Sequence, residues 1–245
     1  MLNNFNPSEI LSEYVGHENL ETATQRKNFT KWVYEAIFSG LKGDILEVGS
    51  GLGTFSEHII RDFPDSSVTL SDISLSYIQN LKEKFSGKNV TVCKLDLNVQ
   101  EDYENIGYEK FDSIIAINVL EHVKNDELAL QQLYKMLRKN GILTVLVPAN
   151  KFLYNVIDKS IGHWRRYTKN ELETKIKNTK FGVEKMFSFN MLGMVGWYVN
   201  GNLCKKAVIN KKASKVFDKL VPVMKVVEKI LQRRIGLSII CYSKK

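Results

Sequence analysis

The feature that most constrains this chain is the alternation of short apolar, β-branched runs with helical patterns along most of its length. Such alternation is typical of βαβ units, which build a mostly parallel sheet covered by helices. The predicted strands are 44–48, 67–72, 89–96, 111–118, 142–148, 182–189 and 236–243. The predicted helices are 21–38, one from near Thr54, 74–85, 126–138 and 169–179, with a turn at Asn140-Gly141 and an irregular or short-helical stretch at 149–168.

Size and cysteine usage exclude several classes of protein. With 245 residues, 44% of them apolar, the chain can bury the core of one large domain. It lacks the roughly 18 uninterrupted apolar residues of a bilayer span and the opening pattern of a signal peptide, so we expect a cytoplasmic protein. Cys93, Cys204 and Cys241 are far apart and form no C-x-x-C pair, and no metal-ligand cluster stands out at helical or hairpin spacing. We therefore expect neither disulfides nor a metal.

Positive charge is concentrated in one segment. Residues 190–234 contain ten basic and two acidic residues, which matches the net charge of +8 of the whole chain. A basic block confined to one apolar-rich segment indicates a local anionic partner. Its basic residues cluster with aliphatic ones rather than alternating with exposed aromatic ones, so we expect no nucleic-acid partner.

A glycine-rich turn follows the first predicted strand, where residues 49–53 read Gly-Ser-Gly-Leu-Gly. Such a turn lets the backbone approach a ligand closely and aims the N–H groups of the next helix at negative charge. A nicotinamide-dinucleotide site needs a third small residue where this chain has Thr54 or Ser56, so that class of ligand fits poorly.

The segment 47–53, Glu-Val-Gly-Ser-Gly-Leu-Gly, resembles the first motif of class I S-adenosylmethionine-dependent methyltransferases, and later landmarks of that family follow in order up to residue 189. The resemblance implies S-adenosylmethionine as the cofactor, with Glu47 and the glycine turn bordering its methionine moiety. It also implies that Asp72 accepts from the ribose hydroxyls, Asp96 faces the adenine and Asn118 lies near the methyl group. The predicted cofactor-binding set is Glu47, Gly49, Ser50, Gly51, Gly53, Asp72, Ile73, Asp96, Leu97 and Asn118.

Three acidic residues of this set can also be judged without the resemblance. Asp72 and Asp96 could be helix caps or turn acceptors, because Asp commonly follows strands. The place of Asp72 after the glycine turn favours a functional role. Glu47 precedes a buried turn, where an unpaired carboxylate would be costly.

Two histidines are candidate catalytic bases. Methyl transfer to a hydroxyl requires an aligned nucleophile and a group that removes its proton. His122 lies in a Leu-Glu-His-Val turn after the fourth predicted strand, where open α/β sheets bind ligands. That turn resembles one found in small-molecule methyltransferases, including quinone-pathway O-methyltransferases, in which the histidine is a base or a structural residue. Both roles stay open for His122.

The second candidate, His163, belongs to the segment Gly-His-Trp-Arg-Arg-Tyr at 162–167. Arg165 and Arg166 offer bidentate donors for a phosphate or carboxylate, and Tyr167 offers an aromatic face, so we predict substrate contact. The alternative is that the two arginines hold this loop through ion pairs. The segment resembles that of bacterial methyltransferases linked to cell-surface glycan or lipid-linked sugar synthesis.

Some 45 residues separate the last two predicted strands, so 190–234 is predicted to be a helical insertion. Residues 216–231 form an amphipathic pattern broken by Pro222. Such a basic helix can lie on the inner face of an anionic membrane, or equally can pack on the core with a solvated lysine face. The predicted apolar face consists of Phe217, Leu220, Met224, Val227 and Leu231.

The resemblance implies a doubly wound α/β protein with a seven-stranded, mostly parallel, Rossmann-like sheet whose last strand is antiparallel. We divide the chain into an N-terminal helical lid (1–41, with Tyr14, His17 and Arg26), a cofactor-binding core (42–189), the insertion (190–234) and a final strand (235–245). The preferred reaction is O-methylation of a small anionic or lipid-linked sugar intermediate. The alternatives are O-methylation of a quinone-type or other hydroxylated metabolite, and a non-catalytic docking module. The sequence gives no oligomeric state.

Overall fold

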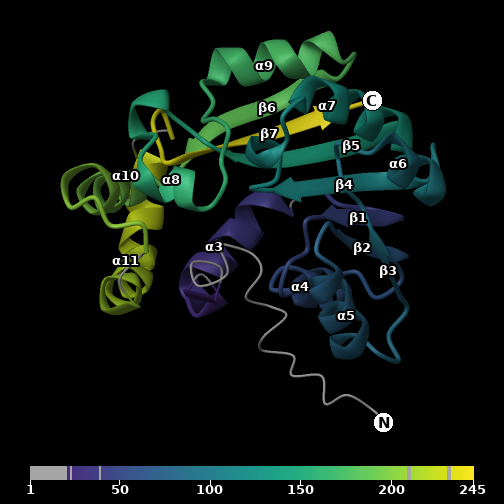
Figure 1. The fold of residues 1–245 in the computed structure, drawn as a ribbon, viewed down its shortest axis with the longest axis horizontal. Helices are drawn as coiled ribbons and strands as arrows, with labels where there is room; N and C mark the ends of the chain where they lie inside the picture. Colours follow the sequence, from purple (N-terminus) through teal and green to yellow (C-terminus); the bar gives the residue numbers. More distant parts are fainter. Residues whose placement is uncertain (1–20, 23, 39, 209–210, 231–232) are drawn as a thin grey trace.

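The computed structural model describes residues 21–22, 24–38, 40–208, 211–230 and 233–245, and its centre is a seven-stranded sheet of order β3-β2-β1-β4-β5-β7-β6 (Figure 1). The pairs from β3 to β5 are parallel, and β7 runs antiparallel to β5 and β6. This arrangement confirms the predicted doubly wound, mostly parallel sheet. The strands are β1 (Ile45–Val48), β2 (Val68–Asp72), β3 (Val90–Lys94), β4 (Phe111–Ile117), β5 (Leu137–Pro148), β6 (Gly182–Phe189) and β7 (Ser238–Lys244).

The start of β5 differs from the prediction. The expected turn at Asn140-Gly141 is wrong, because β5 already begins at Leu137 and continues through both residues. Asn140 has a φ of 64°, a left-handed conformation that asparagine tolerates better than most residues. Its N–H donates to the Lys245 carbonyl (3.2 Å), and Lys245 N–H donates to the Gly141 carbonyl (3.0 Å). The left-handed residue Asn140 therefore lies inside strand β5, where the backbone of β5 hydrogen-bonds to Lys245.

Helices cover both faces of the sheet. Helix α6 was not predicted, because among its seven residues only Tyr103 is buried and it offers little apolar periodicity. Helix α5 begins after Ser74, whose side chain accepts from the Tyr77 N–H. The helices of the core are α3 (Lys27–Ile37), α4 (Ser56–Asp62), α5 (Leu75–Lys84), α6 (Gln100–Ile106), α7 (Asp126–Met136), α8 (Val156–Ser160) and α9 (Lys169–Asn178), with 3₁₀ turns η2 (Leu120–His122) and η3 (Lys151–Leu153).

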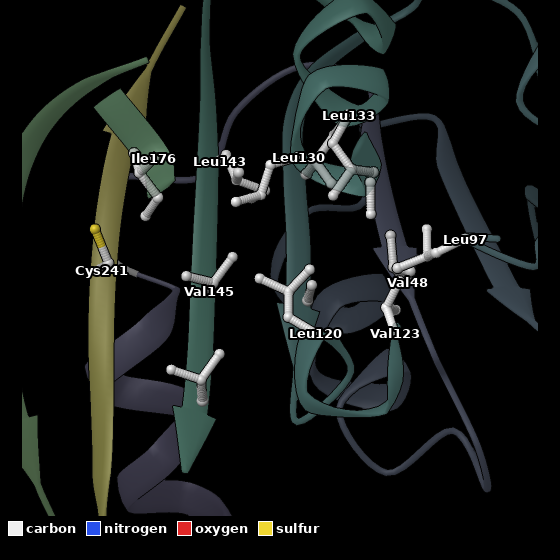
Figure 2. Close-up of a cluster of buried hydrophobic side chains, with 14 of the residues drawn as sticks. Val48, Leu97, Leu120, Val123, Leu130, Leu133, Leu143, Val145, Ile176 and Cys241 are labelled. Carbon is white, nitrogen blue, oxygen red and sulfur yellow. The ribbon is translucent and has the colours of Figure 1, made fainter. Parts of the chain in front are cut away.

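Two hydrophobic cores lie on opposite faces of the sheet, because successive side chains of a strand point to opposite sides. On one face Leu143 and Val145 of β5 pack with Leu130 of α7 and Ile176 of α9, as Figure 2 shows. On the other face the cluster includes Leu146 of β5 together with residues of α3, α4, α5 and α11 (Lys211–Ile230). Each fully buried aliphatic side chain contributes roughly 1.5–3 kcal/mol, so these two clusters hold the strand ends in place.

The predicted helical insertion lies between β6 and β7 and consists of α10 (Met191–Trp197), a π-helical turn η4 (Tyr198–Leu203) and α11. Figure 1 shows it protruding beyond one end of the sheet, where α11 packs against α3 and α10. None of the helices in the described ranges is long and apolar enough to cross a membrane.

Two predictions about α11 are wrong. Pro222 does not break the helix, which continues through it. The carbonyl of Asp218, which Pro222 cannot hydrogen-bond for want of an N–H, accepts from the side-chain amide of Asn28 instead (3.2 Å). Leu220 does not belong to the buried face, because the buried residues are Ser214, Val221, Met224 and Glu228, and Leu231 lies outside the described residues.

Candidate functional site

The glycine turn after β1 has a conformation that L side chains rarely adopt. Gly49, Gly51 and Gly53 have φ values of 71°, 52° and 71°. A Cβ at Gly49 would lie 2.6 Å from a methyl carbon of Val119, and one at Gly53 would lie 2.9 Å from the ring of Phe85. Close packing as well as backbone conformation therefore requires glycine at both positions.

A cavity of about 610 Å³ lies where β1, β2, β3 and β4 end, beside the insertion. Parallel strands place their carboxyl ends at one edge of a sheet, where ligands of this fold class bind. Gly53 does not line the cavity but packs against α5, and Arg165 and Tyr167 line a second, separate hollow. The predicted residues that line the cavity are Glu47, Gly49, Ser50, Gly51, Asp72, Ile73, Asp96, Leu97, Asn118, His122, His163 and Arg166.

Glu47 is a buried carboxyl group at the floor of this cavity. Ser56 Oγ donates to its Oε2, and Ser71 Oγ donates to its main-chain carbonyl (2.9 Å). Burial raises the pKa of Glu47 to about 7, and the hydroxyl of Ser56 opposes that rise. An unpaired buried carboxylate would be costly, as expected from the sequence. Glu47 avoids this cost in two ways: it has a hydrogen-bond partner, and its raised pKa favours the neutral carboxyl group.

Asp72 ends β2 and joins it to the glycine turn. Its Oδ2 accepts from the Gly51 N–H (2.8 Å) and its Oδ1 accepts from the Ser74 N–H (2.9 Å). Burial raises the pKa of Asp72, although both of these hydrogen bonds favour its ionised form. Asp72 is therefore a turn acceptor and a carboxylate of the cavity wall at once.

Three other predicted residues lie at the ends of the neighbouring strands. Asp96 is half-buried, and its Oδ1 accepts from the main-chain and side-chain amides of Asn98 (both 2.9 Å). Asn118 is exposed with a φ of 51°, and its N–H donates to the Leu146 carbonyl (2.8 Å). Ile73 presents an exposed side chain to the cavity. Their roles toward the cofactor stay predictions.

The two candidate bases face each other. The rings of His122 and His163 lie 4.7 Å apart in an edge-to-face arrangement. His163 Nδ1 lies 2.8 Å from Asp158 Oδ1, and its Nε2 lies 3.6 Å from Glu121 Oε1. Burial, followed by the charge of His163, lowers the pKa of His122 to about 4, so its ring is neutral at pH 7.

Glu121 lies behind the two histidines and is fully buried. Neither of its carboxylate oxygens has a hydrogen-bond partner among the described residues, and burial raises its pKa to about 7. Ligand-type atoms of Glu121, His122 and His163 lie within 4.8 Å of one another. No sequence spacing announces this cluster, because His163 comes from a loop about 40 residues further along the chain. The expectation of no metal stays a prediction.

Both arginines of the 162–167 segment are engaged by aspartates. Arg165 Nη1 lies 2.8 Å from Asp126 Oδ2, and the Tyr167 hydroxyl donates to the same oxygen (2.8 Å). Arg166 Nε donates to Asp158 (2.9 Å). These contacts are those of the alternative in which ion pairs hold the loop, so substrate contact by Arg165, Arg166 and Tyr167 stays a prediction.

Several residues of the cavity wall were not among the predicted site residues. Trp197 lies under the guanidinium of Arg166, with 4.7 Å between Arg166 Cζ and the ring centre. Phe29 of α3 and Phe217 of α11 line the cavity with their rings 5.4 Å apart. Arg26 lines it too, with a buried Nε that has no partner among the described residues, whereas Tyr14 and His17 lie outside them. Only tertiary packing brings the aromatic residues together, since no local pattern links them.

Comparison with known proteins agrees with this geometry. Residues 46–143 match the family model of a methyltransferase domain. The chain is 30% identical to malonyl-[acyl-carrier protein] O-methyltransferase 1 of Ilyobacter polytropus over 57% of this chain and 53% of that protein. It is 26% identical to probable polyketide synthase 10 of Dictyostelium discoideum over 71% of this chain and 8% of that protein. The match therefore spans about half of the first relative and a small part of the second.

A solved structure shows the same fold. The S-adenosylmethionine-dependent methyltransferase of Mesorhizobium loti superposes with a TM-score of 0.63 and 12% identity, over 88% of this chain and 98% of that one. Residues 46–143 thus match a methyltransferase domain, and the seven-stranded sheet has the Rossmann-like fold of that solved methyltransferase. S-adenosylmethionine, the cofactor named for that solved structure, is also the one that the sequence predicts. The left-handed glycine turn and the buried Asp72 carboxylate at the end of β2 fit that cofactor.

Proposed function

We propose that the protein transfers a methyl group from S-adenosylmethionine to a hydroxyl oxygen of a small acceptor that has an apolar portion. The observation that carries this proposal is the division of one cavity: the glycine turn and Asp72 line one side, and aromatic residues of α3 and the insertion line the other. A lipid-linked sugar intermediate is the preferred acceptor, and a quinone-type metabolite is the alternative.

The apolar wall favours some of the acceptor classes that the sequence left open over others. Phe29, Trp197 and Phe217 offer ring surface rather than charge. Of the two arginines predicted to hold an anion, Arg165 lines the second hollow beside Asp126. Arg166 lines the cavity but is paired with Asp158. A purely anionic acceptor therefore has weaker support than one that carries an apolar part. The aromatic surface also favours the quinone-type alternative over other hydroxylated metabolites.

Each group of residues has a distinct task in this proposal. The glycine turn, Glu47 and Asp72 would hold the cofactor, which supplies an electrophilic methyl group on its sulfonium. The insertion excludes water and aligns the acceptor oxygen, and alignment is the largest part of what such a displacement requires. His122, neutral at pH 7, would accept the hydroxyl proton. Glu121, close to both histidines, would compensate the positive charge that this proton brings.

The first test is calorimetric titration of S-adenosylmethionine into the wild type and Asp72→Ala. We expect saturable binding by the wild type and at least tenfold weaker binding by the variant, because a charge-assisted hydrogen bond contributes about 1.5–3 kcal/mol. Asp65→Ala, which removes an exposed carboxylate before β2, should bind like the wild type. NADH serves as the control ligand and should not bind.

Two results would overturn the proposal. A folded wild type that binds neither S-adenosylmethionine nor its demethylated product would leave the docking module as the better account. Equal binding by Asp72→Ala and the wild type would remove Asp72 from the cofactor site. If the cofactor binds, acceptors with and without an apolar tail can then be compared for methyl transfer.

A further inference from the structure

Helix α11 has a second apolar face that points away from the protein. Its buried face, built around Val221 and Met224, packs on α3 and completes one of the two cores. An amphipathic helix packed in this way is expected to present polar residues on its remaining surface. The remaining surface of α11 instead carries five aliphatic side chains that are 48–71% exposed, namely Val216, Leu220, Val223, Val226 and Ile230.

These five residues form one stripe. At about 100° per residue, their positions fall within one side of the helix, roughly 130° away from the centre of the buried face. The neighbouring α10 and η4 add further exposed apolar side chains, including Val195 (62% exposed) and Leu203 (63% exposed). Single exposed apolar residues need no explanation, but a group of them over three adjacent elements marks an interaction surface.

Among the described residues of 190–234, the exposed charged side chains are all basic, and the half-buried Lys225 pairs with the exposed Glu35 of α3. Of the two acidic residues in 190–234, Asp218 turns inward and accepts from the Phe29 N–H at the start of α3 (2.8 Å). The other, Glu228, is buried and accepts from the Met191 N–H. The exposed lysines of α11 beside the stripe include Lys215 and Lys219. An exposed aliphatic stripe with a cationic border, in a segment whose two carboxylates both turn inward, is complementary to an anionic bilayer surface.

We propose that α10, η4 and α11 dock the protein on an anionic membrane surface, with the aliphatic stripe of α11 entering the headgroup region. The same elements line the cavity through Gly193, Trp197 and Phe217, so docking brings the cavity wall to the bilayer. The contact is peripheral, since the stripe occupies one side of the helix only. This inference does not depend on methyl transfer, because vesicle binding is measured without cofactor or acceptor.

The test is co-sedimentation of the full chain with vesicles of equal parts phosphatidylglycerol and phosphatidylcholine, compared with phosphatidylcholine alone. We expect binding to the anionic vesicles that is at least tenfold tighter than to the neutral ones and that weakens as salt is raised. Val223→Glu with Val226→Glu should reduce binding at least tenfold. Both side chains are exposed, so the variant should keep the wild-type circular dichroism spectrum and melting temperature.

The matched control is Leu75→Glu with Leu128→Glu. It adds the same charge at two exposed leucines of α5 and α7, outside the insertion, and should bind vesicles nearly as well as the wild type. A folded wild type that ignores anionic vesicles, or equal loss in both double variants, would overturn the proposal. So would a dimer, measured by sedimentation equilibrium, that Val223→Glu with Val226→Glu dissociates, since the stripe would then be the contact between two copies.

Discussion

The two sides of the cavity are built in different ways. The cofactor side consists of one short turn and the residues that end β1 to β4, held by main-chain amides such as that of Gly51 on Asp72. The acceptor side is assembled from α3, the 162–167 loop and the insertion, and it is held by buried hydrogen bonds of Asp158 with His163 and Arg166. Local backbone geometry therefore forms the first side, and long-range pairing of side chains forms the second.

The largest effect is expected on the acceptor side, from Asp158→Asn. Asp158 is fully buried, and its loss of charge leaves the buried guanidinium of Arg166 without a counter-ion. We expect a loss of about 3–5 kcal/mol in the free energy of unfolding, as for other broken buried pairs. Urea denaturation measures it. Asp126→Asn is the comparison, and its cost should be smaller because the side chains of Arg165 and Lys175 are partly exposed to water. Equal costs would contradict this account.

An intermediate effect is expected on the cofactor side, from the pH dependence of Glu47→Gln. The folded pKa of Glu47 is about 7, against an ordinary value of 4.5, so the folded wild type keeps a proton that the unfolded chain releases. The contribution of Glu47 to the free energy of unfolding therefore falls as pH rises from 4.5 to 7 and is constant above that window. The variant lacks this decline. Its free energy of unfolding, relative to that of the wild type, should therefore rise by roughly 2–3 kcal/mol between pH 5 and pH 8.

Urea denaturation of both proteins at pH 5 and pH 8 measures that gain. Glu57→Gln, on the exposed side of α4, is the control and should leave the difference between the two pH values as it is in the wild type. If the difference in the free energy of unfolding between Glu47→Gln and the wild type did not change with pH, Glu47 would have its ordinary pKa in the folded protein.

The smallest effect separates backbone conformation from packing in the glycine turn. Gly49→Ala and Gly87→Ala both place a side chain at a left-handed φ, of 71° and 76°. A Cβ at Gly87 meets nothing within 4 Å, whereas one at Gly49 meets Val119 at 2.6 Å. We expect Gly49→Ala to lose about 1–3 kcal/mol more than Gly87→Ala, the usual cost of overpacking. Thermal or urea unfolding measures it, and equal losses would show that conformation alone requires the glycine.

The cofactor side was largely predictable because its signals are local. The Gly49–Gly53 turn, Asp72 and Asn118 each follow a strand, and parallel strands bring their carboxyl ends together. Gly53, also assigned to the cofactor, packs against Phe85, and its assignment stays a prediction. The acceptor side was less predictable. The adjacent arginines at 165 and 166 suggested anion binding, but distant aspartates engage them.

The sequence by itself determined the seven strands and most of the helices between them, the glycine turn and the concentration of positive charge in 190–234. These features depend on local periodicity, on the conformational freedom of glycine and on composition, all of which can be read along the chain. Only the tertiary structure decided that Glu121, His122 and His163 meet, that Pro222 continues a helix and that α11 turns a second apolar stripe outward. Each of those outcomes depends on which distant segment packs against a residue, and a helical pattern alone cannot say which of two apolar faces the protein will cover.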